Sequence, residues 1–246
     1  MIPYIVINGV DSRTVNGLLI QSLPPITKPK IRTEKNEIDG RDGDLIDKLG
    51  FEAYDKEFTI GLYGQYDVDE VIEYLNAEGK IIFSNEPDKY YEFACYDEID
   101  FDKLLRFRTA KVKYHVQPFK YPADEQPVTY LNDAEGGIFN TIFFKRVKNL
   151  GNYESTPIFE IKGQNDINIY INNKKVLKCA LGASETTIVI DTETMNAYKD
   201  SVDSGVYLNR SCQGDYNDLK LKAGANEIRI TGEIVSLKLS KISRWI

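Results

Sequence analysis

The single histidine, His115, sets a narrow limit on the acid–base and metal chemistry that this chain can support. It shares an alternating polar face with Lys111, Lys113 and Gln117, a pattern typical of the solvated side of a strand. We therefore favour a solvated strand residue over a general base. The chain has no GxSxG, GxxxxGKS/T or GxGxxG motif, so the sequence predicts neither a serine hydrolase of the usual kind nor a nucleotide-binding enzyme.

Two runs of acidic residues have the chemistry of a metal site or a glycosidase pair. They are Asp97, Glu98, Asp100 and Asp102, and Asp39, Asp42, Asp44 and Asp47. The second run lacks the alternating acids before a glycine that a calcium-binding loop requires. Because the chain contains 38 acidic residues, we interpret both runs as solvated loop charge. We predict no catalytic residue, no metal ligand and no cofactor.

The three cysteines, Cys95, Cys179 and Cys212, are odd in number, far apart and without a CxxC pair. This pattern fits neither a disulfide framework nor a zinc site, so we expect three reduced thiols and a cytosolic folding environment. The first residues carry no basic segment before a short apolar stretch, and no apolar run approaches the ~20 residues of a membrane span. We expect neither a signal peptide nor membrane insertion.

The chain is acidic overall, with 31 Lys and Arg against 38 Asp and Glu and a formal net charge of −7. The basic residues are dispersed instead of clustered. Nucleic-acid binders concentrate positive charge on one face, so tight DNA or RNA binding is not predicted.

A length of 246 residues suits two domains, and prolines mark where they join. Pro118, Pro122 and Pro127 fall within ten residues of one another. We place a first domain at residues 1–120, a linker at 121–130 and a second domain at 131–246.

The first half reads as a sheet with one packed helix. Strand alternation is clear at Phe58, Ile60 and Leu62 and again over residues 110–117. A helix is predicted over 68–78, with Asp67 as its N-cap and Gly79 at its C-terminal end.

A protruding hairpin is predicted between Ile31 and Gly50. This stretch is polar, with short apolar positions on either side of two turn signals, Asp39-Gly40 and Asp42-Gly43.

The second half reads as short strands separated by turns, which indicates a β-sandwich. The expected strands cover residues 158–161, 167–171, 187–190, 206–208, 227–230 and 235–239.

Several blocks, taken together and in order, resemble the distal tail protein (Dit) family of long-tailed, siphovirus-type phages. The resemblance covers nearly the whole chain. The blocks are residues 50–64 (GFEAYDKEFTIGLYG), 82–91 (IFSNEPDKYY), 116–121 (VQPFKY), 149–158 (NLGNYESTPI), 166–172 (DINIYIN) and the ending RWI at 244–246.

The resemblance implies a mainly β protein, with an N-terminal β-sandwich carrying one helix and a C-terminal galectin-like sandwich on the outside. The N-terminal domain would build a homohexameric ring at the tail tip of the virion, after synthesis in the host cytoplasm. Expected partners are the major tail tube protein on one side, a tail-associated lysin or tail fibre on the other, and receptor-binding proteins. Phage DNA would pass through the ring, and acidic groups lining the channel would repel its phosphates.

The hairpin tip, Asp39, Gly40, Arg41, Asp42 and Gly43, is the predicted subunit interface. A head-to-tail ring needs a surface on each side of the subunit, and a protruding arm is suited to reach a neighbour. We expect Arg41 to pair with an acidic group of the adjacent subunit. A free surface hairpin remains the alternative.

The competing function is a carbohydrate-binding adhesion module, since galectin-like sandwiches often bind sugars. Such sites use a stacking Trp beside His, Arg and Asn, whereas the second half has no His and its one Trp is Trp245. Trp245 either packs on the core, which we favour, or contacts a partner. A glycosidase built from two of the carboxylates is less favoured still.

Overall fold

The computed structural model describes residues 2–37, 39–40, 42–131 and 142–246. The chain divides into two compact units, one ending at Ala123 and one running from Asp124 to Trp245. Strand β9 (Thr109–Pro122) continues to the boundary and β10 (Val128–Leu131) begins soon after it, so only residues 123–127 lie between strands.

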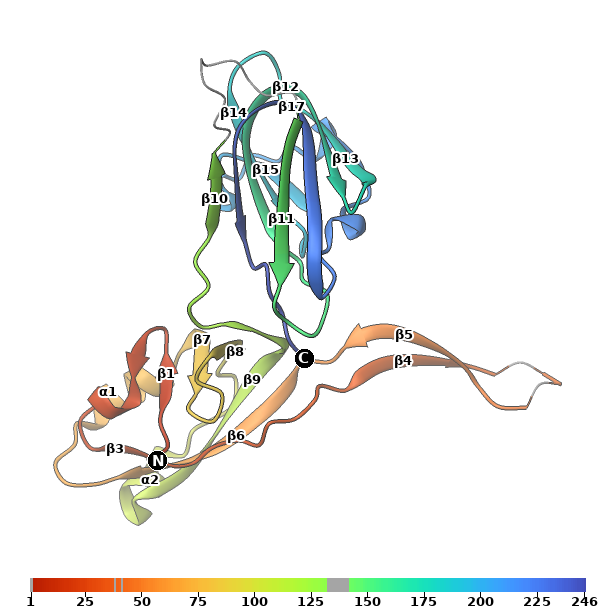
Figure 1. Cartoon of the computed structure of the whole chain (residues 1–246). Helices are drawn as coiled ribbons and strands as arrows, with labels where there is room; N and C mark the ends of the chain where they lie inside the picture. Colours follow the sequence, from red (N-terminus) through yellow and green to blue (C-terminus); the bar gives the residue numbers. More distant parts are fainter. Residues whose placement is uncertain (1, 38, 41, 132–141) are drawn as a thin grey trace. The chain divides into compact units, whose positions relative to one another are not determined.

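The first unit is built on one antiparallel sheet with the strand order β2–β1–β7–β8–β9–β6–β3 (Figure 1). The resemblance implied a sandwich here, but the hydrogen-bonded sheet is continuous. The first half of the long strand β9 pairs with β6 and its second half with β8, which joins what would otherwise be two sheets. The remaining strands are β1 (Ile5–Ile7), β2 (Val10–Asp11), β3 (Leu18–Ser22), β6 (Tyr54–Leu62), β7 (Glu78–Phe83) and β8 (Lys89–Ala94).

The alternation predicted for β6 and β9 is confirmed and forms the core of this unit. Phe58 and Ile60 of β6, and Val112 and Tyr114 of β9, are almost fully buried on one face of the sheet. Burying each such side chain contributes about 1.5–3 kcal/mol. The Tyr114 hydroxyl donates to the Leu75 carbonyl at 2.8 Å, which fastens the helix above to the sheet.

Helix α1 (Val68–Leu75) begins as predicted, since the Asp67 side chain accepts hydrogen bonds from the amides of Asp69 and Glu70. Its predicted end was wrong, because Gly79 lies in strand β7 with φ of +123°. The side chain of Asn8 occupies the space beside this glycine, where it accepts from the Lys80 amide at 2.9 Å. A Cβ at residue 79 would displace that side chain.

A second helix, α2 (Phe101–Phe107), was not predicted, so the expectation of one helix was wrong. Asp100 caps its N-terminus by accepting from the Lys103 amide at 2.8 Å, and Arg108 ends it in the left-handed conformation. Leu104 is buried against the sheet. Among the described residues no helix is long and apolar enough to cross a membrane.

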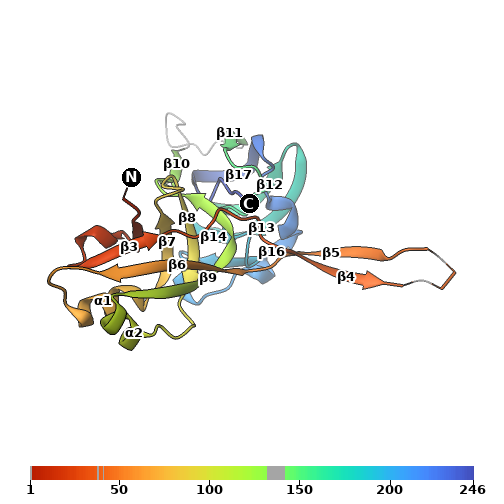
Figure 2. The ribbon, with the colours of Figure 1, turned by 90° about the horizontal axis from the view of Figure 1, so that it is seen from below.

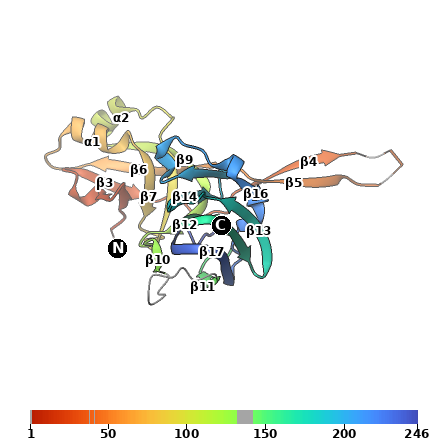
Figure 3. The same cartoon turned by 90° about the horizontal axis from the view of Figure 1, so that it is seen from above.

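The predicted hairpin is present as a separate two-stranded sheet of β4 (Ile31–Asn36) and β5 (Leu45–Phe51). The two strands run side by side away from the seven-stranded sheet of their own unit (Figure 2, Figure 3). Ile38 and Arg41, near the tip, lie outside the described residues.

The second unit is built on one eight-stranded antiparallel sheet, which its two longest strands connect. The first half of β12 (Ile158–Ile171) pairs with β14 and with the end of β17 (Gly224–Ser240), and its second half pairs with β13 and the start of β17. The buried side chains of these strands form one core. The other strands are β11 (Ile142–Asn149), β13 (Lys174–Ala180), β14 (Thr186–Asp191), β15 (Asn196–Lys199) and β16 (Cys212–Gly214).

One predicted strand of this unit, residues 206–208, was wrong. The segment forms only an isolated bridge between Tyr207 and Tyr198 of β15. Two backbone hydrogen bonds flank this bridge, from the Lys199 amide to the Val206 carbonyl and from the Leu208 amide to the Ala197 carbonyl. The pairing stops at Asn209, whose side-chain Oδ1 accepts from the Ala197 amide at 2.5 Å.

Candidate assembly surface

The β4–β5 hairpin is exposed on both faces. Every residue of its two strands is exposed apart from Ile31 and Phe51 at the base, which are partly buried. There Phe51 packs edge-to-face on Phe119, with ring centroids 5.6 Å apart, and the Glu52 amide donates to the Lys30 carbonyl at 2.8 Å. The hairpin is thus anchored at one end and uncovered along its length.

Three aliphatic side chains of β5 face solvent, with exposed fractions of 41% at Leu45, 52% at Ile46 and 55% at Leu49. An isolated two-stranded hairpin is marginally stable in water. Strand edges with unpaired amides and carbonyls also invite pairing with another chain. These features are typical of a segment that a partner covers.

Over residues 33–36 and 45–48 the strand register places the lysines on one face and the acids on the other, because directly opposed residues share a face. We call Thr33, Lys35, Ile46 and Lys48 the basic face and Glu34, Asn36, Leu45 and Asp47 the acidic face, from their pairing in β4 and β5. Lys35 lies 3.4 Å from Asp44 in an exposed ion pair. Glu34 stands opposite Asp47, and like charges at that spacing repel each other.

The predicted interface at the tip is only partly described. Gly40 and Gly43 both have φ of +81°, which favours glycine and agrees with the two turn signals. Asp39 and Asp42, each directly before one of these glycines, are exposed. Arg41, the residue expected to pair with a neighbour, lies outside the described residues.

His115 belongs to a surface ion network on β9. Its Nδ1 is 2.8 Å from Asp55 Oδ1, and Lys113 bridges Asp55 at 3.3 Å and Asp97 at 2.8 Å. The hydrogen bond with His115 is the main reason that the pKa of Asp55 is lowered. This partly exposed arrangement stabilises neighbouring strands. In the described parts of the chain, no three His, Cys, Asp or Glu residues are grouped as a metal site would require.

The first unit also contains a buried cluster of charged residues that was not predicted from the sequence. Lys56 and Lys120 are 3% and 6% exposed, and Lys120 Nζ lies 2.8 Å from Glu86 Oε1. The Tyr91 hydroxyl donates to the other Glu86 oxygen at 2.7 Å. Lys56 Nζ donates to the Pro25 carbonyl at 3.0 Å, and burial lowers the pKa of Lys56 to about 8. The burial of Lys56 could have been predicted, because residue 56 lies on the same face of β6 as the buried Phe58 and Ile60.

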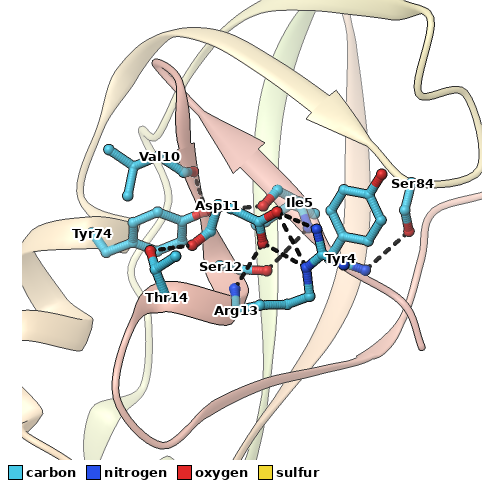
Figure 4. Close-up of polar contacts among 9 residues, drawn as sticks. All are labelled: Tyr4, Ile5, Val10, Asp11, Ser12, Arg13, Thr14, Tyr74 and Ser84. Atoms are coloured by element: carbon cyan, nitrogen blue, oxygen red, sulfur yellow. Dashed lines mark hydrogen bonds and ion pairs between the residues drawn. The ribbon is translucent and has the colours of Figure 1, made fainter.

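Polar contacts also fix the start of the chain (Figure 4). Arg13 forms an ion pair with Asp11 at 2.5 Å, and its hydrogen bond to the Asp11 side chain lowers the pKa of Asp11. The Arg13 guanidinium also stacks over the Tyr4 ring, 4.0 Å from the ring centroid. The Tyr74 hydroxyl donates at 3.2 Å to the Ile5 and Val10 carbonyls. These bonds tie α1 to the β1–β2 turn and serve the fold.

Two blocks that carried the resemblance meet in the second unit. Asn149 Nδ2 donates to the carbonyls of Tyr153 and Leu221, at 2.8 and 3.2 Å. Arg244 is 4% exposed, and its Nε donates to the Glu154 carbonyl at 2.7 Å. This contact locks the end of the chain onto the start of the unit. Trp245, next to it, is half-buried.

Neither a protein-family model nor a curated protein sequence matches this chain. Solved structures do match it. One is the SPP1 Dit protein (gp 19.1), described as a paradigm of hub adsorption apparatus in phages that infect Gram-positive bacteria, with a TM-score of 0.64 and 16% identity over 100% of both chains. Another is a chain of the phage P2 baseplate in its activated conformation with Ca, with a TM-score of 0.53 and 9% identity over 97% of both chains. The chain therefore has the fold of the SPP1 protein over its full length.

Proposed function

We propose that this protein is a distal tail protein, a non-enzymatic structural component that forms a hexameric ring at the tip of a phage tail. The full-length fold similarity to SPP1 Dit, which includes both units and their order, carries the proposal. The ring joins the tail tube to a tail-associated lysin or fibre and to host-adsorption proteins, and DNA passes through it. The second unit is a galectin-like sandwich on the outer side.

The hairpin supplies a physical basis for ring closure. A heterologous ring needs two different and complementary surfaces on each subunit. The basic face of one hairpin, with Lys35 and Lys48, complements the acidic face of the next, with Glu34 and Asp47. Stacking in this order also covers the exposed Leu45 and Ile46, which is the larger source of association free energy. The tip residues Asp39 to Gly43 reach farther along the neighbour, where Arg41 finds an acidic partner.

Charge reversal of each face tests the model. One variant, Lys35→Glu with Lys48→Glu, has two acidic faces, and the other, Glu34→Lys with Asp47→Lys, has two basic faces. Alone, each variant repels its own copies, so native mass spectrometry and negative-stain images should show loss of the ring. Mixed in equal amounts, they should form rings in which the variants alternate, since six is an even number.

The matched control reverses two lysines outside the hairpin, Lys111→Glu and Lys178→Glu, both on exposed ion pairs. It should form rings like the wild type. Wild-type assembly is measured across a concentration series, with and without the tail tube protein. Rings from either single-face variant at wild-type yield would refute the hairpin contact. Replacing Arg41 and Asp42 by alanine tests the tip separately, and unchanged ring stability would exclude its role.

A further inference from the structure

Two of the three thiols, which the sequence places far apart, meet in the second unit. Cys179 of β13 and Cys212 of β16 are directly opposed in the antiparallel register, and their Sγ atoms are 2.7 Å apart. Opposed residues of antiparallel strands have Cα atoms about 4.5–5.5 Å apart, which lies within the range that a disulfide spans. A bond between these two sulfurs therefore needs no rearrangement of the backbone.

The two thiols differ in environment. Cys179 is fully buried in the core, whereas Cys212 is partly exposed at the short edge strand β16. The neighbouring Cys179 thiol lowers the pKa of Cys212, and the pKa of Cys179 is raised. Burial of Cys212 opposes this shift, and a hydrogen bond with the Tyr216 hydroxyl adds to it. Cys212 is thus the attacking thiolate and Cys179 the resolving thiol.

We propose that Cys179 and Cys212 are a redox-active pair that is reduced in the cytosol and closes to a disulfide in oxidising surroundings. The oxidant is a small-molecule disulfide such as oxidised glutathione. The Cys212 thiolate attacks one sulfur of glutathione disulfide and expels one glutathione thiolate. The Cys179 thiol then loses its proton, attacks Cys212 Sγ in the mixed disulfide and expels the second glutathione. Two protein thiols are oxidised, and one glutathione disulfide is reduced to two glutathiones.

The bond would fasten an edge of the second unit. β16 contains three residues and pairs with β13, and the chain between the two cysteines includes β14 and β15. Closing this loop restricts the unfolded chain, so the oxidised protein should unfold at a temperature about 5–10 °C above the reduced protein. This inference does not depend on the proposed role in a phage tail.

The test treats the whole folded chain with oxidised glutathione or with dithiothreitol, unfolds it in guanidinium containing N-ethylmaleimide, and measures the intact mass. The reduced protein should carry N-ethylmaleimide on all three cysteines. The oxidised protein should carry it on Cys95 alone, and peptide mapping should show Cys179 linked to Cys212. Thermal unfolding followed by circular dichroism gives the shift in midpoint.

Two variants separate the pair from the remaining thiol. Cys212→Ser should abolish both the bond and the redox-dependent midpoint, while Cys95→Ser should keep both. Three N-ethylmaleimide adducts after oxidation of folded wild type would overturn the proposal. A glutathione adduct that persists on Cys212 would do the same, because it would mean that Cys179 cannot resolve the mixed disulfide.

Discussion

At the scale of single residues, Lys56 is a buried ionisable group that should make stability depend on pH. Its pKa in the folded protein is about 8, against 10.5 ordinarily, because burial disfavours the charged form. Between these values the unfolded chain binds more protons, so the free energy of unfolding rises with pH. We expect Lys56 to contribute a gain of about 2 kcal/mol between pH ~7.5 and ~9.5, measured by urea denaturation as the difference between the wild type and Lys56→Met.

A matched pair of variants isolates this effect. Lys56→Met should remove the gain that Lys56 contributes, and Lys111→Met, at an exposed ion pair in the same sheet, should keep it. Cys179 opposes this gain in both proteins, because its pKa is raised in the folded chain while the unfolded thiol ionises near pH 9. Above about pH 10 the unfolded tyrosines also ionise and favour unfolding, because burial raises the pKa values of Tyr91 and Tyr114 in the folded chain. If the free energy of unfolding of Lys56→Met rose with pH as steeply as that of the wild type, the pH dependence would belong to another group.

At the scale of elements, the end of the chain is held by a close backbone approach at Gly151. A Cβ on this residue would overlap the carbonyl group of Arg244. Gly151→Ala should therefore lower the free energy of unfolding by about 1–3 kcal/mol, as overpacking usually does. Chemical denaturation of the whole chain, with the second unit followed by Trp245 fluorescence, measures the loss.

The control for this prediction is Gly182→Ala. Gly182 has φ of +88° and open space where a Cβ would lie, so it reports backbone strain without a clash. Gly182→Ala should lower the free energy of unfolding by less than Gly151→Ala does, by roughly 1 kcal/mol. Equal losses at both sites would mean that the contact with Arg244 adds nothing.

The elements also show what the sequence could predict. Strand alternation at 58–62 and 110–117, the Asp67 cap and the hairpin turns are local signals, and each led to the right element. Helix α2 is too short for its apolar period to stand out, and its cap, Asp100, resembled part of an acidic run. Strand β13 begins with two exposed lysines that hide its alternation.

The pairings that matter for the candidate sites are non-local, and no local pattern contains them. The register that places Lys35 and Lys48 on one face of the hairpin depends on the bulge between Arg32 and Thr33. Cys179 and Cys212 meet only because β16 pairs with β13. Lys120 of β9 forms an ion pair with Glu86, which lies just before β8 in the sequence. Sequence spacing alone gives no reason to expect these contacts.

At the scale of the whole molecule, the net charge of −7 bears on the proposed passage of DNA through a ring. Non-specific affinity for DNA comes mainly from Lys and Arg contacts to phosphates and is lost in proportion to their number. A conduit must let DNA move, so we expect no retardation of a duplex fragment by the assembled ring in a gel at about 0.15 M salt. Lowering the salt tenfold should leave this result unchanged, because repulsion grows as screening weakens.

The control uses the same assay on the variant Glu34→Lys with Asp47→Lys, mixed with its acidic counterpart so that rings can form. If the hairpin faces are buried between subunits, as proposed, the added lysines are neutralised across the interface and the mixed ring still does not retard DNA. If the hairpins instead line the channel, the basic variant alone still forms rings, and its added cations should retard DNA at low salt, with an effect that fades as salt is raised. DNA binding by the wild-type ring at physiological salt would argue against a freely passing conduit, whichever surface is responsible.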